Sequence, residues 1–163
     1  MKKSSLTIGL CFSGIIAALY IVLTLIFQPI SFGAIQFRIS EALTLLPILS
    51  PFSIWGVSVG CLLANIISGA PLPDIIFGSL ATLISALLTY RLRKYIWLAA
   101  IPPVICNAVV IGLVLTYAYH IPTLWLNMLT VGIGQAVVCY ALGVPFVTIL
   151  RKKYGNTLSN LIK

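Results

Sequence analysis

The sequence has few charged residues, and its only acidic side chains are Glu41 and Asp74. Of its 163 residues, 7% are charged and 61% are hydrophobic. A soluble globule of this size needs more polar surface than that, so a soluble enzyme domain is excluded. The charges are also too few for a disordered tail.

The sequence also lacks the residues from which most catalytic and metal sites are built. It has one histidine, His120, and no phosphate-binding Gly-rich loop, H-E-x-x-H zinc motif or G-x-S-x-G nucleophile motif. Its four cysteines lie inside apolar runs, which indicates small core residues and not a secreted disulfide framework. We therefore expect no catalytic residue, no metal and no cofactor.

Long hydrophobic runs make up most of the chain. A membrane helix needs about 20 apolar residues, and prolines or basic clusters separate the runs here. The first run is too long for a signal peptide and has no small-residue cleavage site. The sequence predicts a single all-α integral membrane domain over 1–163, a six-transmembrane-helix bundle. The expected spans are 6–27, 33–49, 52–68, 75–90, 95–119 and 124–150.

The ten Lys and Arg residues lie in short clusters at the ends of these runs, without the interleaved aromatics of a nucleic-acid interface. If six helices alternate, the clusters at 2–3, 91–94 and 151–153 share one side of the membrane. Because positive flanks are retained in the cytoplasm, both termini are expected to be cytoplasmic. We expect a multi-pass plasma-membrane protein of bacterial type, with no nucleic-acid partner. Arg38 is the one basic residue that does not lie on the cytoplasmic side in this arrangement, because it is at the outer end of the second span.

Arg38 and Glu41 are a base and an acid that enter the same expected span. A charged side chain costs about 2.5 to 3.5 kcal/mol at the bilayer centre, so it must be paired, face a cavity or reach water. Their i, i+3 spacing places both on one helix face. They form either a structural ion pair or the polar cap of an outward-facing pocket in which Glu41 accepts hydrogen bonds from a ligand.

Four further polar residues leave the same choice open. Asp74, just before the fourth span, either caps that helix or contacts a ligand. The amides of Asn65, Asn107 and Gln135 either join helices to each other or line one outward-open cavity with the acids. Such a cavity suits a small planar heterocycle with several N–H donors. The candidate substrate-binding residues are Phe37, Arg38, Glu41, Asn65, Asp74, Asn107 and Gln135, with Tyr117 and Trp125 as further aromatics.

The first span carries two stripes of small residues, Gly9-x-x-x-Ser13-x-x-x-Ala17 and Gly14-x-x-x-Ala18. Small residues flatten a helix face and let another helix approach closely. The approaching helix belongs either to this bundle or to a second protein. The candidate docking residues are Ser13, Gly14, Ala17 and Ala18.

Three blocks carry a family resemblance: IQFRISEALTLLP at 35–47, GCLLANIISG at 60–69 and DIIFGSLATLISALLTYRLRK at 74–94. With the fifth span, which contains Pro102-Pro103 and Asn107, the sequence resembles the QueT transporters, membrane S-components of energy-coupling factor (ECF) importers for queuosine precursors. The resemblance implies a non-enzymatic six-helix protein that binds its substrate from outside. It also implies a 7-deazaguanine substrate such as preQ1 or queuine.

The same resemblance implies two kinds of protein partner, a transmembrane T-component and two cytoplasmic ATPases, and the bundle itself is expected to contact membrane lipid. S-components present an A-x-x-x-A motif on their first helix to the T-component, and here Ser13/Ala17 or Gly14/Ala18 stand in the comparable place. It further suggests that the loop 28–37 closes the outer mouth when ligand binds, after which the bundle reorients.

Three alternatives remain open. The chain could bind another vitamin-like heterocycle, or act as a small oligomeric channel or facilitator without an ATPase partner. Large polar groups thin out below Asn107 and Gln135, which favours a one-sided pocket over a pore. A membrane-embedded enzyme using Glu41 and Asp74 as its acid/base pair lacks a nucleophile or metal cluster in the sequence.

Overall fold

The computed structural model describes residues 3–31 and 37–162, with side chains over 6–29 and 37–153. The all-α prediction is confirmed, since the described residues form helices and no strand. Residues 32–36 of the loop 28–37, which include residues 33–36 of the expected second span, lie outside the described residues. The elements are α1 (Lys3–Ile26), α2 (Gln28–Ser31), η1 (Ile39–Ile48), α3 (Phe52–Ile67), η2 (Asp74–Gly78), α4 (Ser79–Arg91), α5 (Ile96–Ala99), α6 (Ile101–Tyr117), α7 (Leu124–Val137), η3 (Val138–Gly143) and α8 (Val144–Ile162).

Within residues 3–31 and 37–162, four helical segments are long and apolar enough to cross a membrane. They are Leu6–Ile26, Asp74–Arg91, Ile96–Tyr117 and Leu124–Lys153, and the segments Ile39–Ile48 and Phe52–Ile67 are apolar but shorter. The last of the long segments joins α7, the π-helix η3 and α8 into one continuous rod. Six apolar segments therefore correspond in order to the six expected spans, but two of them are too short to be typical transmembrane helices.

The second segment differs most from its expectation. Instead of a span over 33–49, the described residues form the ten-residue 3-10 helix η1. Pro47 inside η1 has no N–H to donate, and Thr44 Oγ1 donates to the Glu41 carbonyl at 2.6 Å. At about 2 Å per residue, η1 extends about 20 Å and falls short of the bilayer core. Irregular backbone survives at membrane depth only where protein encloses it, and every residue from Ser40 to Ile48 is buried.

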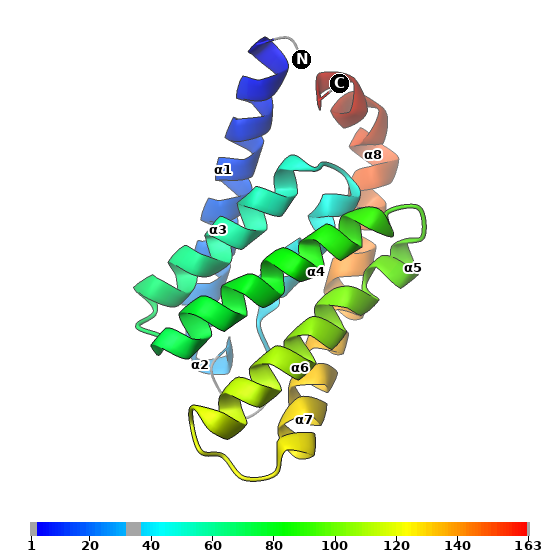
Figure 1. The fold of residues 1–163 in the computed structure, drawn as a ribbon. Helices are drawn as coiled ribbons and strands as arrows, with labels where there is room; N and C mark the ends of the chain where they lie inside the picture. The colour runs from blue at the N-terminus through cyan, green and yellow to red at the C-terminus, as the bar shows by residue number, and fades with distance from the viewer. Residues whose placement is uncertain (1–2, 32–36, 163) are drawn as a thin grey trace.

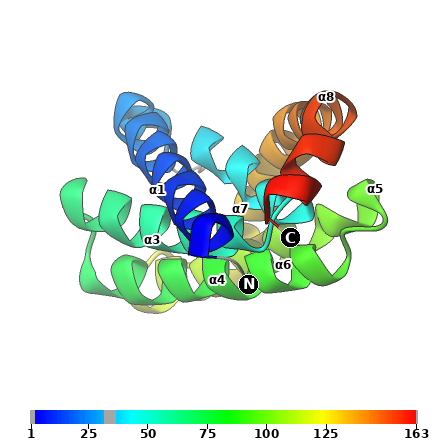
Figure 2. The ribbon, with the colours of Figure 1, turned by 90° about the horizontal axis from the view of Figure 1, so that it is seen from above.

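Two groups of helices enclose η1. Viewed along the bundle, α1 and α8 lie on one side and α3, α4 and α6 on the other (Figure 2). η1 contacts α1 and α8 from the first group, α3 and α4 from the second, and also η3. The central element of the bundle is therefore the segment that carries Glu41, with Arg38 at its N-cap.

Small residues set the close contact between α1 and α3. A Cβ atom added to Gly56 would lie 2.8 Å from the Ser13 carbonyl oxygen, and one added to Gly60 would lie 2.8 Å from Tyr20 Cβ and 3.0 Å from Ala17 Cα. The two helices meet through a Gly-x-x-x-Gly face, the arrangement by which membrane helices gain van der Waals contact without a hydrophobic driving force. This contact fixes the position of Tyr20 next to η1.

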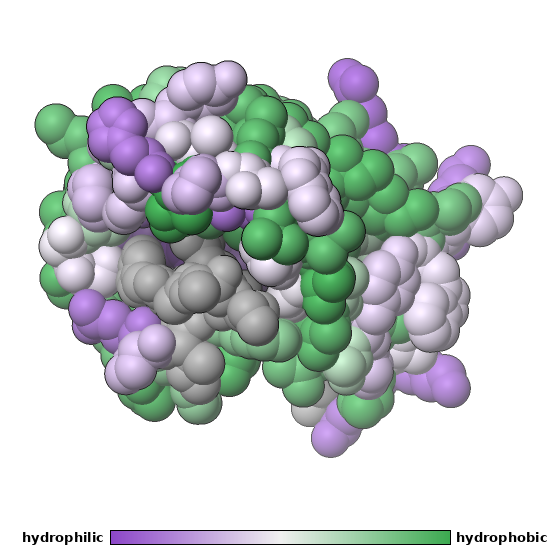
Figure 3. Space-filling view, turned by 90° about the horizontal axis from the view of Figure 1, so that it is seen from below, coloured by the Kyte–Doolittle hydropathy of each residue, from purple (hydrophilic) through white to green (hydrophobic). Residues whose placement is uncertain are grey.

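The two termini lie at the same end of the bundle (Figure 1). The exposed basic residues Arg91, Arg93 and Lys94 lie at this end, and Arg151 Nη1 donates to the Arg93 carbonyl at 3.5 Å. Viewed from the opposite end, hydrophobic side chains form most of the visible surface, between smaller hydrophilic patches (Figure 3). This distribution fits a protein whose sides face lipid.

We predict that Gly60→Ala lowers the stability of the detergent-solubilised protein by about 1 to 3 kcal/mol, because the new methyl group overpacks a backbone contact with α1. Gly14→Ala is the matched control, since nothing lies within 4 Å of its added Cβ. Thermal unfolding followed by tryptophan fluorescence measures both. Equal unfolding temperatures for the two variants would contradict the packing described.

Candidate functional site

Glu41 is the centre of a buried polar cluster. Its side chain is 1% exposed. Oε1 accepts a hydrogen bond from the Tyr20 hydroxyl at 2.5 Å, and Oε2 accepts one from Gln135 Nε2 at 3.2 Å. These donors come from α1 and α7, so three segments far apart in the sequence converge on one carboxylate. A second polar contact, from Thr24 Oγ1 to Ser40 Oγ at 2.8 Å, also joins α1 to η1.

Arg38 begins a second chain of contacts, at the end of the bundle away from the termini. Its Nη2 donates to Asn65 Oδ1 at 2.5 Å, and Asn65 Nδ2 donates to the Asp74 carbonyl at 3.1 Å. The Asp74 carboxylate accepts a hydrogen bond from the Tyr119 hydroxyl. Arg38, Asn65 and Asp74 are all at least 93% buried, so these contacts are shielded from solvent.

Arg38 joins the two sets of contacts into one network. Its guanidinium group interacts electrostatically with both Glu41 and Asp74. A buried charge is tolerated only when opposite charges and hydrogen bonds compensate it, and removing one partner of such a pair typically costs about 3 to 5 kcal/mol. The only two acids of the chain are therefore held around one buried base.

Two π-helical segments flank this network. Asp74 begins η2, and η3 starts three residues after Gln135. Such widened turns are rare and occur often at functional sites. In η2, a Cβ atom added to Gly78 would lie 3.4 Å from Asn65 Nδ2, so glycine leaves room for the amide. Each wide turn thus adjoins a residue that holds the polar network in place.

Asp74 does not cap its helix through its side chain. Pro73 occupies the N-cap position, and the Asp74 carboxylate accepts from Tyr119 instead. Burial and this hydrogen bond raise the pKa of the Tyr119 hydroxyl, which stays protonated and able to donate. Asp74 therefore acts as an acceptor at the outer edge of the network.

Asn107 has unused hydrogen-bonding capacity. It lies on α6 and is 5% exposed, and its side chain makes no hydrogen bond to any residue that the structure describes. Asn65 and Gln135, by contrast, are held by Arg38 and Glu41. Its amide therefore remains able to bond to solvent or to a ligand. Phe37, which directly precedes Arg38, is half-buried.

Two residues of the polar network, Tyr20 and Tyr119, are not among the binding residues predicted from the sequence. Tyr20 could have been found, because Tyr20 and Thr24 are spaced i, i+4 and put two hydroxyl groups on one face of the first apolar run. That face continues the stripe through Ser13 and Ala17. Tyr119 lies after the end of α6, where no periodic pattern indicates that it reaches Asp74.

The two stripes of small residues on α1 have different surroundings. Ser13 and Ala17 pack on Gly56 and Gly60 of α3, whereas Gly14 and Ala18 are exposed and no atom lies near the position of a Gly14 Cβ. The first stripe therefore supports the bundle, and the second leaves a flat, unoccupied face.

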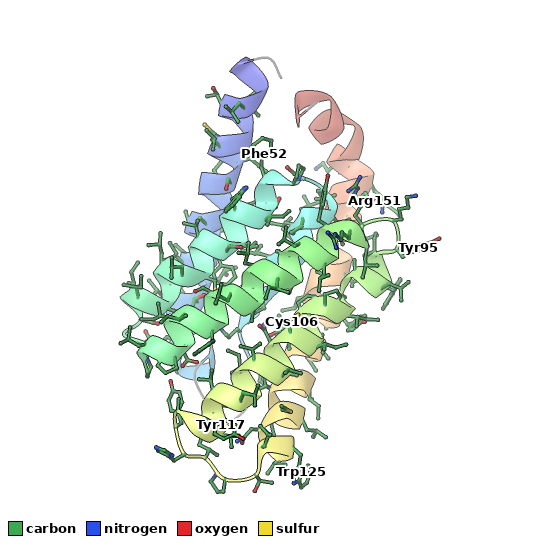
Figure 4. All side chains as sticks on the ribbon, in the orientation of Figure 1. Phe52, Tyr95, Cys106, Tyr117, Trp125 and Arg151 are labelled. Atoms are coloured by element: carbon green, nitrogen blue, oxygen red, sulfur yellow. The ribbon has the colours of Figure 1, made fainter. Side chains whose placement is uncertain are left out.

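An apolar pocket lies beside this network and differs from it chemically. It measures about 430 Å³ between η2 and α6, and Phe77, Leu113 and Tyr117 are among its lining residues. Its lining contains no carboxylate and no amide. Tyr117 and Trp125 lie at the end of the bundle away from Tyr95 and Arg151 (Figure 4). The pocket could hold an apolar group, but the groups that select hydrogen-bond donors lie in the buried network.

The network is suited to binding a polar ligand. An ionised carboxylate has about four lone-pair positions, and Tyr20 and Gln135 occupy two of those of Glu41. The other two have no donor among the described residues. No cluster of three metal-ligating side chains occurs within the described part of the chain.

Comparison with known proteins identifies the family of the chain. The QueT transporter family profile matches residues 10–152, which confirms the resemblance found in the sequence. A queuosine precursor transporter QueT from Lactococcus lactis subsp. cremoris is 38% identical over 104 residues. The match spans 60% of this chain and 60% of that relative. No solved structure matches the chain.

We predict that Tyr20→Phe destabilises the ligand-free protein by about 1 to 3 kcal/mol, because the buried Glu41 carboxylate loses a donor. Tyr140→Phe is the control, since Tyr140 donates to the Trp97 carbonyl in an exposed position and its loss should cost less than about 1 kcal/mol. Chemical unfolding in detergent measures both. Equal costs would mean that Tyr20 does not support Glu41.

Proposed function

Because the chain belongs to the QueT transporter family, we propose that it is the substrate-binding S-component of an ECF-type importer for a queuosine precursor. It is a multi-pass membrane protein. The substrate is a 7-deazaguanine base such as preQ1 or queuine, and the chain itself catalyses no reaction. One observation carries the proposal: a buried carboxylate, Glu41, is held by Tyr20 and Gln135 with two lone-pair positions to spare.

Glu41 has the central role in recognition. Its two remaining lone pairs accept N–H donors from the pyrimidine edge of the deazaguanine, a bidentate contact that fixes the plane of the ring. Gln135, already bonded to Glu41, and Asn107, which has no partner among the described residues, complete the hydrogen bonds. A site whose polar groups are left unsatisfied by the wrong ligand discriminates strongly against it.

Arg38 and Asp74 act at the outer edge of the same site. Arg38 positions the Glu41 segment through its contact with Asn65. Asp74 takes the cationic aminomethyl arm of preQ1, when that arm is present, in place of part of its interaction with Arg38. Phe37 stacks on the heterocycle.

Active transport requires an energy source, and the sequence contains no nucleotide-binding motif of its own. A transmembrane T-component and two cytoplasmic ATPases supply it. The exposed stripe of Gly14 and Ala18 is the face of α1 that meets the T-component, since α3 covers Ser13 and Ala17.

We predict that the purified chain binds preQ1 or queuine at least about tenfold more tightly than guanine or thiamine. Glu41→Gln replaces an acceptor-only group by one that also donates, and it should weaken binding by about 100-fold. Asn107→Ala should weaken it by about tenfold. Isothermal titration calorimetry in detergent measures these affinities.

The matched control for Asn107→Ala is Asn127→Ala. Asn127 is also a buried amide, but it bonds to Thr116 and to the Ile121 carbonyl, away from Glu41. Its removal should lower stability and leave affinity unchanged. If none of the four compounds binds, the substrate assignment is wrong, and if Glu41→Gln binds as tightly as the parent, the site is wrong.

The docking face gives a separate prediction. Gly14→Leu with Ala18→Leu should abolish co-purification of the T-component and ATPases and leave binding of preQ1 intact, because the bulky side chains separate the helices without touching Glu41. Ile15→Leu, at a neighbouring exposed position on α1, is the control. Undiminished assembly of the double variant would exclude this face as the T-component contact.

A further inference from the structure

A group of exposed basic residues surrounds the corner between α4 and α5, at the end of the bundle where the termini lie. Arg91 ends α4, and Arg93 and Lys94 follow in the turn. Arg93 lies over the Tyr90 ring at 4.2 Å, which fixes its guanidinium group at the corner. We call Arg91, Arg93 and Lys94 the corner bases.

An apolar groove begins at this corner. It has a volume of about 270 Å³ and is formed by Leu88 and Leu92 of the α4 end, Leu98 of α5, and Ile101 and Ile105 of α6. Cys106 also lines it and lies midway along the bundle in Figure 4. The groove therefore runs from the basic corner towards the middle of the bundle.

The corner bases and the groove are directly connected. Leu92 lies between Arg91 and Arg93 in the chain, and Arg91 follows Leu88 by three residues, so that both occupy one face of α4. Tyr95 and Trp97, 65% and 66% exposed, flank the same corner. Exposed Tyr and Trp residues mark the level of the lipid headgroups in membrane proteins.

No acidic side chain of this protein is near the corner bases. The two acids, Glu41 and Asp74, are buried in the polar network around Arg38. Any anion that pairs with the corner bases therefore comes from outside the Asp and Glu side chains of the chain. The retention of basic residues on the cytoplasmic side accounts for positive charge at one end of the bundle. It does not account for the position of these bases beside an apolar groove.

From this juxtaposition we propose that the corner binds one anionic glycerophospholipid, its phosphate on Arg91 and Lys94 and an acyl chain in the groove. A lipid tail fits the groove better than a protein segment does. The lining offers only hydrophobic side chains and Cys106, and a peptide backbone placed there would leave its N–H and C=O groups unsatisfied unless it was helical. The lipid anchors the α4–α5 corner at the membrane surface.

Native mass spectrometry of the purified full chain with phosphatidylglycerol and phosphatidylcholine of identical acyl chains tests the proposal. The parent protein should retain phosphatidylglycerol at about tenfold lower concentration than phosphatidylcholine. Arg91→Gln with Lys94→Gln should bring the two lipids to within about twofold of each other. Lys152→Gln with Lys153→Gln removes the same charge from α8 and should keep the preference.

The groove is tested separately from the charge. Cys106→Phe fills it and should weaken retention of both lipids, whereas Val109→Phe adds the same ring on an exposed face of α6 and should not. The thermal transition of each variant checks that it folds. If Cys106→Phe does not fold, the charge variant at the exposed positions 91 and 94 still tests the proposal.

Three outcomes would overturn the proposal. One is equal retention of the two lipids by the parent protein. Another is loss of the preference in the α8 control to the same extent as in the corner variant, which would indicate a diffuse charge effect. The third is an unchanged preference in Arg91→Gln with Lys94→Gln, which would leave the corner to a protein partner or to topology alone.

Discussion

The constraint on which the rest of the structure depends is the burial of one base and two acids inside an apolar bundle. Arg38, Glu41 and Asp74 cannot be exposed to lipid, so helices must enclose them and supply hydrogen bonds. The surroundings of η1 follow from this: α1 provides Tyr20, α7 provides Gln135, and packed helices shield a segment whose backbone is not α-helical. A polar core of this kind is costly as a scaffold, which is why we assign it a function.

Composition and run length were sufficient to predict an all-helical membrane protein, because hydrophobicity along the chain reports directly on membrane insertion. They did not predict η1. A run containing Ser40, Glu41 and Pro47 was assigned to a full span from its average hydrophobicity, yet the proline and the i, i+3 hydrogen bonds favour a tighter helix. Averaging over a window hides such local backbone preferences. The two π-helical segments were equally invisible, because tertiary packing produces them and no residue pattern does.

The identities of the buried polar residues could be predicted, but their partners could not. The sequence places Arg38 and Glu41 on one helix face and leaves open whether they form an ion pair or cap a pocket, and the structure adds Asn65 and Tyr20 from two other helices. A sequence shows that a polar residue in an apolar run needs a partner, whereas the partner depends on how helices pack. The same limit explains why the two stripes of small residues on α1 were indistinguishable until the position of Gly60 on α3 was known.

The central position of η1 also has a consequence for biogenesis. Gln135 follows Glu41 by 94 residues, so the ribosome must complete most of the chain before that carboxylate gains its second donor. During this interval Arg38 and Glu41 have already been synthesised, while α7 and α8 have not entered the bilayer. The segment 38–48 can pack first against α1, α3 and α4, and its contacts with η3 and α8 form only when those later elements arrive. The polar core around Glu41 is therefore completed late in insertion, and a chain that is truncated before α7 should be a target for membrane quality control.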